Sequence, residues 1–257
     1  MTTSAELERA IGGPAFMYPW RLRDGREVPL AVAELESVHR TRSEMIEPRV
    51  RAALAAAGPE ATALDLACNE GWFSQRLLEW GAGRVVGVDL RALNIQRATL
   101  LRDHYEVPAD RLAFRQADLF DVDAASLGVH DVVFVLGLIY HVENPMGVLR
   151  LARQCTRPGG LCVVESQLTQ QNEPIVHGNG RAAQFHRAEG SFAVVIEKGD
   201  NALASSGAVL SLVPNRVALE QMARMAGFDD VQFATASADR DHNPQYVDGD
   251  RAVIFAS

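Results

Sequence analysis

The sequence predicts an α/β fold built on a doubly wound, mostly parallel β-sheet. Short apolar runs alternate with helical segments from residue 58 onward, and the run at 132–136 is apolar throughout. Strands that are apolar along their whole length belong to a sheet covered on both faces, and helical connections between them make the strands parallel. The length of 257 residues suits one such domain with a modest addition.

The alternation predicts five strands and the helices that connect them. The expected strands are residues 63–67, 84–89, 112–116, 131–136 and 161–165, the last of them following a turn at Pro158-Gly159-Gly160. The expected helices are residues 41–57, 72–80, 92–104 and 145–155. A sheet of this kind binds ligands in a crevice at the carboxyl ends of its strands.

The whole chain is expected to form a single domain with four segments. Residues 1–57 are an N-terminal extension, irregular up to residue 40 and then helical, and residues 58–166 are the cofactor-binding core. Residues 167–213 are polar and glycine-rich, with β-like runs at 192–196 and 208–212, and are predicted to be a lid or acceptor-binding insertion. Residues 214–257 add a helix at 216–226 and two strands, near 231–234 and 252–256, that we expect to pair antiparallel at an edge.

Composition narrows the function classes. The formal net charge of −8 disfavours a protein whose main contact is the nucleic acid backbone. No stretch approaches the roughly 18 apolar residues of a membrane helix, and residues 1–10 lack the apolar core of a secretory signal. The three cysteines form no C-x-x-C pair and no zinc spacing, so we expect reduced thiols, no metal site and a cytoplasmic protein. A homodimer is left open.

Three residues after consecutive strands indicate a nucleoside site. Gly71 follows the first strand, where a glycine allows close approach of a ligand to the free amides of the next helix. Asp89 ends the second strand, at the place where a dinucleotide fold positions an acid for ribose hydroxyls. Asp118 follows the third strand and can accept from an exocyclic amine. Each acid alone is more often a turn or helix cap, and the conjunction carries the prediction.

These motifs resemble those of class I S-adenosylmethionine (SAM)-dependent methyltransferases, which have a Rossmann-like fold. The segment Asp65-Leu66-Ala67-Cys68-Asn69-Glu70-Gly71 is similar to their first motif, although Ala67 and Asn69 replace two of three usual glycines. The resemblance implies SAM as cofactor and S-adenosylhomocysteine (SAH) as product. It assigns cofactor contacts to Asp65, Ala67, Cys68, Asn69, Gly71, Asp89, Leu90, Ala117, Asp118, Leu119 and Leu136.

A nicotinamide-dependent dehydrogenase is the competing cofactor class. It requires G-x-G-x-x-G at this turn, whereas only Gly71 is present and the bulky Trp72 and Phe73 follow it. Such a pair would crowd a pyrophosphate at the helix N-terminus, and SAM has no pyrophosphate. The methyltransferase interpretation is therefore favoured.

The segment after the fourth strand supplies the candidate catalytic groups. Leu138-Ile139-Tyr140-His141 is similar to the tRNA wobble-uridine carboxymethyltransferase family and its small-molecule relatives, in which the tyrosine contacts the cofactor's carboxylate. The family's lysine has no counterpart in the N-terminal region, which favours ordinary SAM and disfavours tRNA. His141 is the first candidate general base, with a structural histidine as the alternative. Glu165 is the second candidate, with a structural carboxylate as the alternative.

The sequence therefore predicts a SAM-dependent O-methyltransferase acting on a hydroxyl of a small polar acceptor, such as a saccharide or a specialised metabolite. Polar residues of the insertion suit hydroxyl-rich ligands: Asn172, His177, Arg181, Gln184 and His186. Tyr18, Trp20 and Trp72 are candidates for stacking on a flat ligand, with core packing favoured for Trp72. A divalent metal, held by His177 and His186 with an acid, has no supporting ligand spacing. A tRNA acceptor and a non-catalytic SAM-binding scaffold are the alternative functions.

Overall fold

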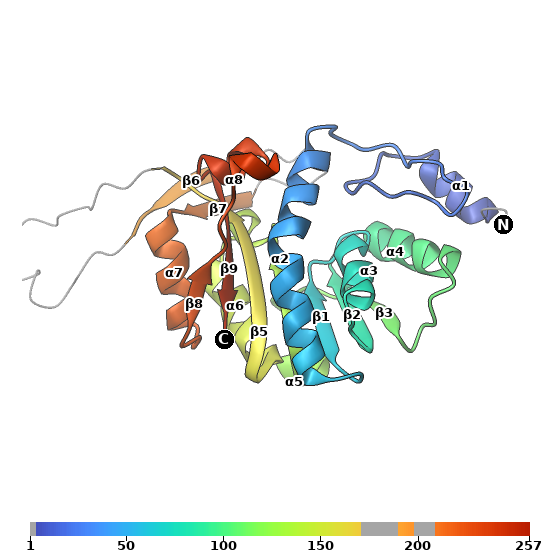
Figure 1. Ribbon diagram of the computed structural model, residues 1–257. Coiled ribbons are helices and arrows are strands. Elements are labelled where there is room, and N and C mark those ends of the chain that lie inside the picture. Colours follow the sequence, from blue (N-terminus) through green and yellow to red (C-terminus); the bar gives the residue numbers. More distant parts are fainter. Residues whose placement is uncertain (1–3, 171–189, 198–208) are drawn as a thin grey trace, which may run out of the picture.

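The central feature of the computed structural model is a seven-stranded sheet in the order β3-β2-β1-β4-β5-β9-β8 (Figure 1). The structure describes residues 4–170, 190–197 and 209–257. Its parallel strands are β1 (Thr62–Leu66), β2 (Arg84–Asp89), β3 (Leu112–Gln116), β4 (His130–Leu136) and β5 (Thr156–Gln167). β9 (Arg251–Ala256) runs antiparallel between β5 and the edge strand β8 (Val231–Phe233). The predicted mostly parallel sheet and the antiparallel pairing of the last two strands are confirmed.

Helices cover both faces of the sheet. One face carries α2 (Leu35–Ala57), α3 (Trp72–Glu79) and α4 (Ala92–His104), and the other carries α5 (Ala124–Leu127), α6 (Pro145–Cys155) and α7 (Arg216–Met225). Side chains alternate between the two faces along each strand. In β4, for example, Val132 and Phe134 belong to the first core and Val133 and Val135 to the second.

The N-terminal region is more regular than predicted. Residues 5–11 form α1 (Ala5–Ile11), whose N-cap Ser4 accepts a hydrogen bond from the Leu7 N–H, and α1 packs against α4. Helix α2 begins at Leu35, not at residue 41 as predicted. The start was not recognised because the N-cap residue, Glu34, makes no side-chain capping bond. Thr41 has the chemistry of an N-cap but lies inside α2, where its hydroxyl accepts from the Asn243 N–H at 2.8 Å.

The predicted turn before the fifth strand lies inside β5. Thr156 pairs with His130, and the next pairing joins Leu161 to Val132, so residues 157–160 are looped out of the ladder. Gly159 at φ +76° supplies the left-handed backbone that this bulge needs. The predicted turn is therefore a bulge inside the strand, and the strand is longer than expected.

The part of the predicted insertion that the structure describes is a separate antiparallel pair, β6 (Phe192–Glu197) and β7 (Val209–Pro214). β7 packs against the 3-10 turn η1 (Ile139–His141), at the carboxyl end of β4. The predicted acceptor-binding residues of the insertion, Asn172, His177, Arg181, Gln184 and His186, lie outside the described residues. The C-terminal part adds the turn η3 (Ala238–Arg240) and the short helix α8 (Pro244–Val247) before β9. Among the helices described, none has the length and apolar character needed to cross a bilayer.

Candidate active site

The loop after β1 has left-handed backbone at two positions that are not glycine. Ala67 (φ 59°) and Asn69 (φ 51°) both have left-handed backbone, at the two positions where the resemblance expects glycine. This conformation is uncommon for residues with a Cβ, and asparagine tolerates it better than most. The Asn69 N–H donates to Asp89 Oδ2 at 2.9 Å, which fixes the loop to the end of β2. The substitutions therefore preserve the shape of the motif.

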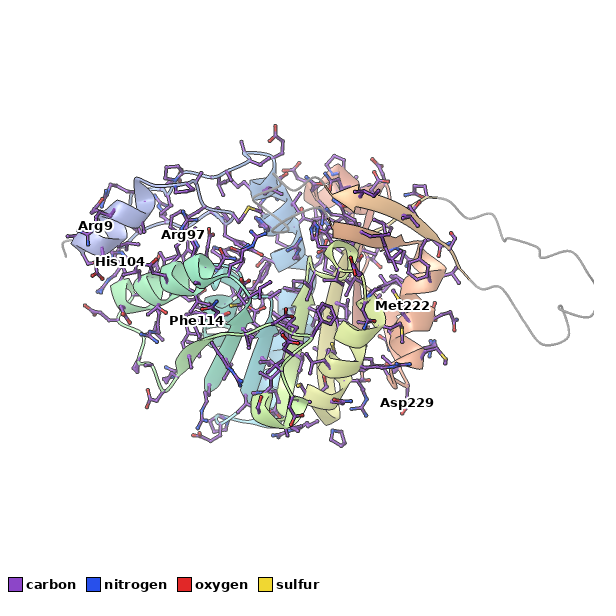
Figure 2. The ribbon with its side chains drawn as sticks, turned by 180° about the vertical axis from the view of Figure 1, so that it is seen from behind. Arg9, Arg97, His104, Phe114, Met222 and Asp229 are labelled. Atoms are coloured by element: carbon purple, nitrogen blue, oxygen red, sulfur yellow. The ribbon has the colours of Figure 1, made fainter. Side chains whose placement is uncertain are left out.

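Gly71 is required by the packing of this loop. It has φ +77° and lies at the start of α3, and a Cβ there would come within 2.5 Å of the Phe114 ring on β3. Figure 2 shows Phe114 below α4, inside the sandwich of helix and sheet. Packing against Phe114, and not the close approach of a ligand, is therefore what requires glycine at this position.

A cavity of about 490 Å³ lies at the carboxyl ends of β1 to β4. Its volume is in the range of small-molecule sites, roughly 300–1,000 Å³. Seven of the predicted cofactor residues border it: Ala67, Asn69, Asp89, Leu90, Asp118, Leu119 and Leu136. Four others do not: Asp65, Cys68, Gly71 and Ala117. The residues that follow the predicted strands thus indicate where the cavity lies, although not all of them border it.

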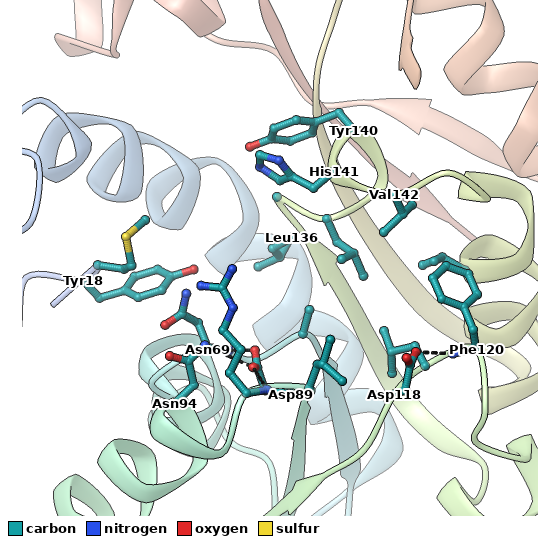
Figure 3. A pocket seen from close by; sticks show the side chains of 18 of the residues that line it. Tyr18, Asn69, Asp89, Asn94, Asp118, Phe120, Leu136, Tyr140, His141 and Val142 are labelled. Carbon is teal, nitrogen blue, oxygen red and sulfur yellow. Dashed lines mark hydrogen bonds between the residues drawn. The ribbon is translucent and has the colours of Figure 1, made fainter. Parts of the chain in front are cut away.

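Two carboxylates from adjacent strands face this cavity (Figure 3). Asp89 accepts from the Arg91 N–H at 2.9 Å and from the Asn94 amide at 3.0 Å, in addition to Asn69. Asp118 accepts from the Phe120 N–H at 2.9 Å through Oδ1, and its Oδ2 accepts from no residue that the structure describes. Both carboxylates are held in fixed orientations and retain acceptor capacity, which suits the hydroxyls and amine of a nucleoside.

Asp65 has a structural role behind the cavity. Its carboxylate is buried and accepts from the Ser74 hydroxyl at 2.6 Å, which ties the end of β1 to α3. Burial is the main cause that raises the pKa of Asp65, from 3.8 to about 7, despite this hydrogen bond. Asp65 does not border the cavity, so the cofactor contact that the resemblance assigns to it stays a prediction.

The predicted catalytic pair lies on η1, above the loop. His141 borders the cavity, and its ring centroid is 4.1 Å from that of Tyr140. The Tyr140 hydroxyl accepts from Arg251 Nη1 at 3.2 Å. Burial raises the pKa of Tyr140, so its hydroxyl stays protonated at neutral pH. Figure 3 shows Tyr140 and His141 on the side of the cavity opposite Asp89.

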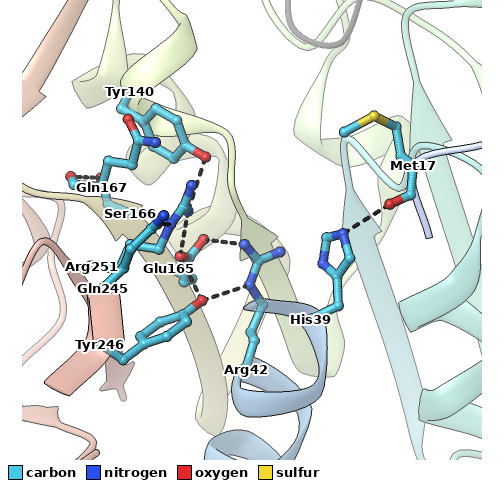
Figure 4. Close-up of polar contacts among 10 residues, drawn as sticks. All are labelled: Met17, His39, Arg42, Tyr140, Glu165, Ser166, Gln167, Gln245, Tyr246 and Arg251. Carbon is cyan, nitrogen blue, oxygen red and sulfur yellow. Dashed lines mark hydrogen bonds and ion pairs between the residues drawn. The ribbon is translucent and has the colours of Figure 1, made fainter. Parts of the chain in front are cut away.

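Glu165 lies in a buried ion cluster, which we call the β5 cluster (Glu165, Arg42, Arg251 and Tyr246; Figure 4). Its side chain is fully buried and does not border the cavity. It is 3.0 Å from Arg42 Nη2 and 2.9 Å from Arg251 Nη1, and it accepts from the Tyr246 hydroxyl at 2.9 Å. Burial alone would raise the pKa of Glu165, but the two guanidinium groups outweigh it and hold the pKa below 4.5. This geometry favours the structural alternative over a general base.

Several residues that border the cavity were not recognised in the sequence. His39 and Arg42 come from α2, and Arg251 comes from β9. Tyr18, which the sequence did indicate as a candidate ligand contact, also borders the cavity and comes from the N-terminal segment. For Arg42 a signal exists, because Ile46, Val50 and Leu54 continue the same face of the helix at intervals of four residues and are buried. A charged residue in register with an apolar stripe faces the interior.

The cavity offers a further polar group that a ligand would satisfy. Asn69 Oδ1 is buried at the cavity wall and accepts no hydrogen bond from the residues that the structure describes. Buried polar atoms are rarely left without a partner. Together with Asp89 and Asp118, this acceptor fits a nucleoside that carries a cationic substituent. Over the described ranges no three histidine, cysteine or acidic side chains group as a metal site would need.

Comparison with known proteins identifies methyltransferases as relatives of this chain. The family model for the Methyltransferase domain matches residues 38–233. The tRNA U34 carboxymethyltransferase of Pseudomonas putida (strain W619) is 27% identical over 237 residues, which cover 91% of this chain and 63% of that protein. The tRNA U34 carboxymethyltransferase of Azotobacter vinelandii is 35% identical over 105 residues, which cover 40% of this chain and 31% of that protein. The chain spans less than two thirds of the length of either relative.

Among solved structures, the N-terminal domain of EvdMO1, crystallised in the presence of SAH and D-fucose, superposes with a TM-score of 0.69. Its sequence is 20% identical, and the match covers 100% of this chain and 97% of that domain. A SAM-dependent methyltransferase from Mesorhizobium loti superposes with a TM-score of 0.52 at 19% identity, covering 84% and 99%. At sequence identities this low, the two superpositions show a shared fold and no more.

Proposed function

The chain belongs to the Methyltransferase domain family, and we propose that it uses SAM to methylate a hydroxyl of a small polar acceptor. The observation that carries this proposal is the arrangement of the cavity. Asp89 and Asp118 border one side, and the Tyr140–His141 pair borders the opposite side (Figure 3). A bound nucleoside and an acceptor would then meet between them.

In this proposal the chain binds and orients the cofactor through the strand ends. SAM supplies a methyl group on a sulfonium, which is already a strong electrophile. Asp89 accepts from ribose hydroxyls and Asp118 Oδ2 accepts from the adenine amine, while Leu119 and Leu136 line the apolar parts of the cavity. Positioning of the reacting groups supplies most of the rate enhancement in such a displacement.

His141 acts in the proposal as the general base that removes the acceptor's hydroxyl proton. A histidine is suited to this role because its charge state changes near neutral pH. Arg251 and Arg42 also border the cavity, and the β5 cluster has two guanidinium groups for one carboxylate. Its net positive charge would stabilise the negative charge that develops on the acceptor oxygen. Glu165 is then a positioning residue that holds both arginines.

A saccharide is the acceptor class that we favour. The cavity has a polar end at Tyr140 and His141, where hydroxyl groups can find partners. The N-terminal domain of EvdMO1, which matches the full length of this chain in fold, was crystallised in the presence of D-fucose as well as SAH. Free sugars and nucleotide-linked sugars are therefore the first acceptors to test.

His141→Ala tests the proposal. With labelled SAM and the sugar panel, turnover should fall by about 10²- to 10⁴-fold, the usual contribution of a general base. SAH affinity, measured by calorimetry, should stay within about twofold. His104→Ala is the matched control, since His104 lies at the end of α4 and outside the cavity. Intact turnover in His141→Ala would overturn the assigned role.

A tRNA acceptor is the second candidate, and the names of the two relatives favour it. It predicts that unmodified tRNA incorporates label from SAM in the same assay, and that added salt weakens the association. The net charge of −8 counts against it. A non-catalytic scaffold, the third alternative, predicts SAH binding with no label transfer to sugars, tRNA or fractionated extract.

A further inference from the structure

We infer that Tyr18 binds the amino-acid end of the cofactor and that the buried Glu70–Arg97 ion pair is what positions Tyr18 to do so. The inference rests on SAM as the cofactor and is independent of the acceptor. Neither residue of the ion pair borders the cavity, so Glu70 and Arg97 are positioning residues. The inference assigns a function to the N-terminal segment, which the family motifs do not cover.

The ring of Tyr18 packs against three other aromatic rings of the protein, whereas its hydroxyl remains available to a ligand. The His39 ring lies 4.1 Å from the Tyr18 ring, Trp72 is stacked at 5.8 Å and Phe73 packs edge-on at 5.9 Å. The predicted stacking of Tyr18 on a ligand is therefore disfavoured. The hydroxyl points into the cavity (Figure 3) and has no hydrogen-bond partner in the described part of the chain. Burial raises the pKa of Tyr18, so this hydroxyl remains a donor at neutral pH.

The order of groups around the cavity identifies which end of the cofactor reaches Tyr18. Figure 3 shows Asp118 on one side, Asp89 between, and Asn69 with Tyr18 on the other side. A nucleoside with its base at Asp118 and its ribose at Asp89 directs its 5′ substituent toward Asn69 and Tyr18. In SAM and SAH that substituent ends in an ammonium and a carboxylate. A phenol donor suits the carboxylate, and the unpartnered Asn69 Oδ1 suits the ammonium.

The Glu70–Arg97 ion pair joins the motif loop to the segment that carries Tyr18. Glu70 accepts from the Met17 N–H at 3.0 Å and is 3.0 Å from Arg97 Nη1. Arg97 also donates to the carbonyls of Pro14 and Ala15. The two side chains are 1% and 4% exposed, so solvent does not weaken the pair.

Two further contacts fix the same segment. The guanidinium of Arg97 lies over the Phe16 ring at 4.1 Å from its centroid. His39 Nε2 is 3.0 Å from the Met17 carbonyl oxygen. Figure 2 shows Arg97 between α4 and the N-terminal segment. The backbone on the N-terminal side of Tyr18 is thus held from two directions, which determines where the hydroxyl lies.

Calorimetric titration with two ligands tests the contact. SAH carries the amino-acid end, and 5′-methylthioadenosine has the same nucleoside and sulfur without it. Tyr18→Phe should weaken SAH binding by about tenfold, the usual effect of removing one hydrogen bond to a charged group, and leave methylthioadenosine binding unchanged. Tyr105→Phe is the matched control, because the Tyr105 hydroxyl bonds to the Arg21 carbonyl outside the cavity. Unchanged SAH affinity, or an equal loss for both ligands, would overturn the inference.

Glu70→Gln tests the positioning role with the same two ligands. It should reproduce the selective loss of SAH affinity, and the double variant with Tyr18→Phe should bind SAH no more weakly than the weaker single variant. An equal loss for both ligands would instead make the ion pair a support of the whole loop and overturn its assigned role. If Glu70→Gln does not fold, Arg97→Lys replaces it, since that change keeps the charge but loses the planar fork. No acceptor is present, so failure of the proposed O-methylation leaves these titrations unaffected.

Discussion

Two buried ion clusters hold the two ends of the chain to the same sheet, and they differ in composition. The Glu70–Arg97 pair attaches the N-terminal segment to the loop after β1 and to α4. The β5 cluster joins β5 to α2, β9 and α8 through Glu165, Arg42, Arg251 and Tyr246. The first has one guanidinium for one carboxylate, and the second has two.

This difference determines the charge state of each carboxylate. Burial raises the pKa of Glu70 from 4.5 to about 7, and the hydrogen bond from Met17 and the charge of Arg97 only partly offset it. At Glu165 burial acts in the same direction, but two arginines reverse the outcome and lower the pKa. The β5 cluster is therefore charged throughout the neutral range, whereas the Glu70–Arg97 pair can gain a proton within it. The number of cations around a buried carboxylate thus decides whether the site is fixed or responsive to pH.

Glu165→Gln should have the largest effect on stability. It leaves Arg42 and Arg251 buried beside each other without a counter-charge, and breaking a buried ion pair in this way costs about 3–5 kcal/mol. Urea denaturation at neutral pH measures the change. Glu220→Gln is the control, because its pair with Arg224 on α7 is partly exposed and should contribute less than about 0.5 kcal/mol. A loss at Glu165 as small as at Glu220 would remove the distinction between buried and exposed pairs.

The pH dependence of stability should distinguish the two clusters. The pKa of Glu70 is higher in the folded state than its usual 4.5, so on raising the pH the unfolded chain releases its proton first. The contribution of Glu70 is therefore fully present at low pH and declines as the pH rises from about 4.5 to about 7, by at most about 3 kcal/mol. Asp65, raised from 3.8 to about 7, acts in the same direction.

Urea denaturation from about pH 5 to about pH 8 checks this prediction. Glu70→Gln should flatten the decline, and the remainder should follow Asp65. Glu165→Gln should lower stability at every pH and leave the slope over this range unchanged, since the pKa of Glu165 lies below it. A slope that Glu165→Gln changes and Glu70→Gln does not would reverse the assignment of the two clusters.

The two clusters also mark the limit of what the sequence revealed. The strands, and Asp89 and Asp118 at their ends, were predictable because strand periodicity and the topology of a parallel sheet place them. Glu165 was predicted as the last residue of the fifth strand, which continues to Gln167. It was a candidate base as well as a candidate structural carboxylate, because its partner Arg42 lies more than a hundred residues earlier in the chain. Local pattern cannot reveal partners at that separation.

The N-terminal segment was less predictable still. Its path depends on hydrogen bonds from the Met17 N–H to Glu70 and from Arg97 to the Pro14 carbonyl, which no periodicity encodes. The aromatic residue Tyr18 was recognised as a candidate ligand contact. The ring contacts with His39 and Trp72, which leave only the hydroxyl for a ligand, required the tertiary structure.

Tyr246→Phe should have the smallest effect and tests whether charge or hydrogen bonding holds the β5 cluster together. The Tyr246 hydroxyl donates to Glu165 and accepts from Arg42 Nε at 3.2 Å, so its loss removes two hydrogen bonds while both ion pairs remain. We expect a loss of about 1–2 kcal/mol by urea denaturation, well below that of Glu165→Gln. In the double variant the two effects should not add, because the hydroxyl acts mainly through the carboxylate. Full additivity would mean that Tyr246 stabilises the fold independently of Glu165, and the cluster would then be two ion pairs with a neighbouring tyrosine.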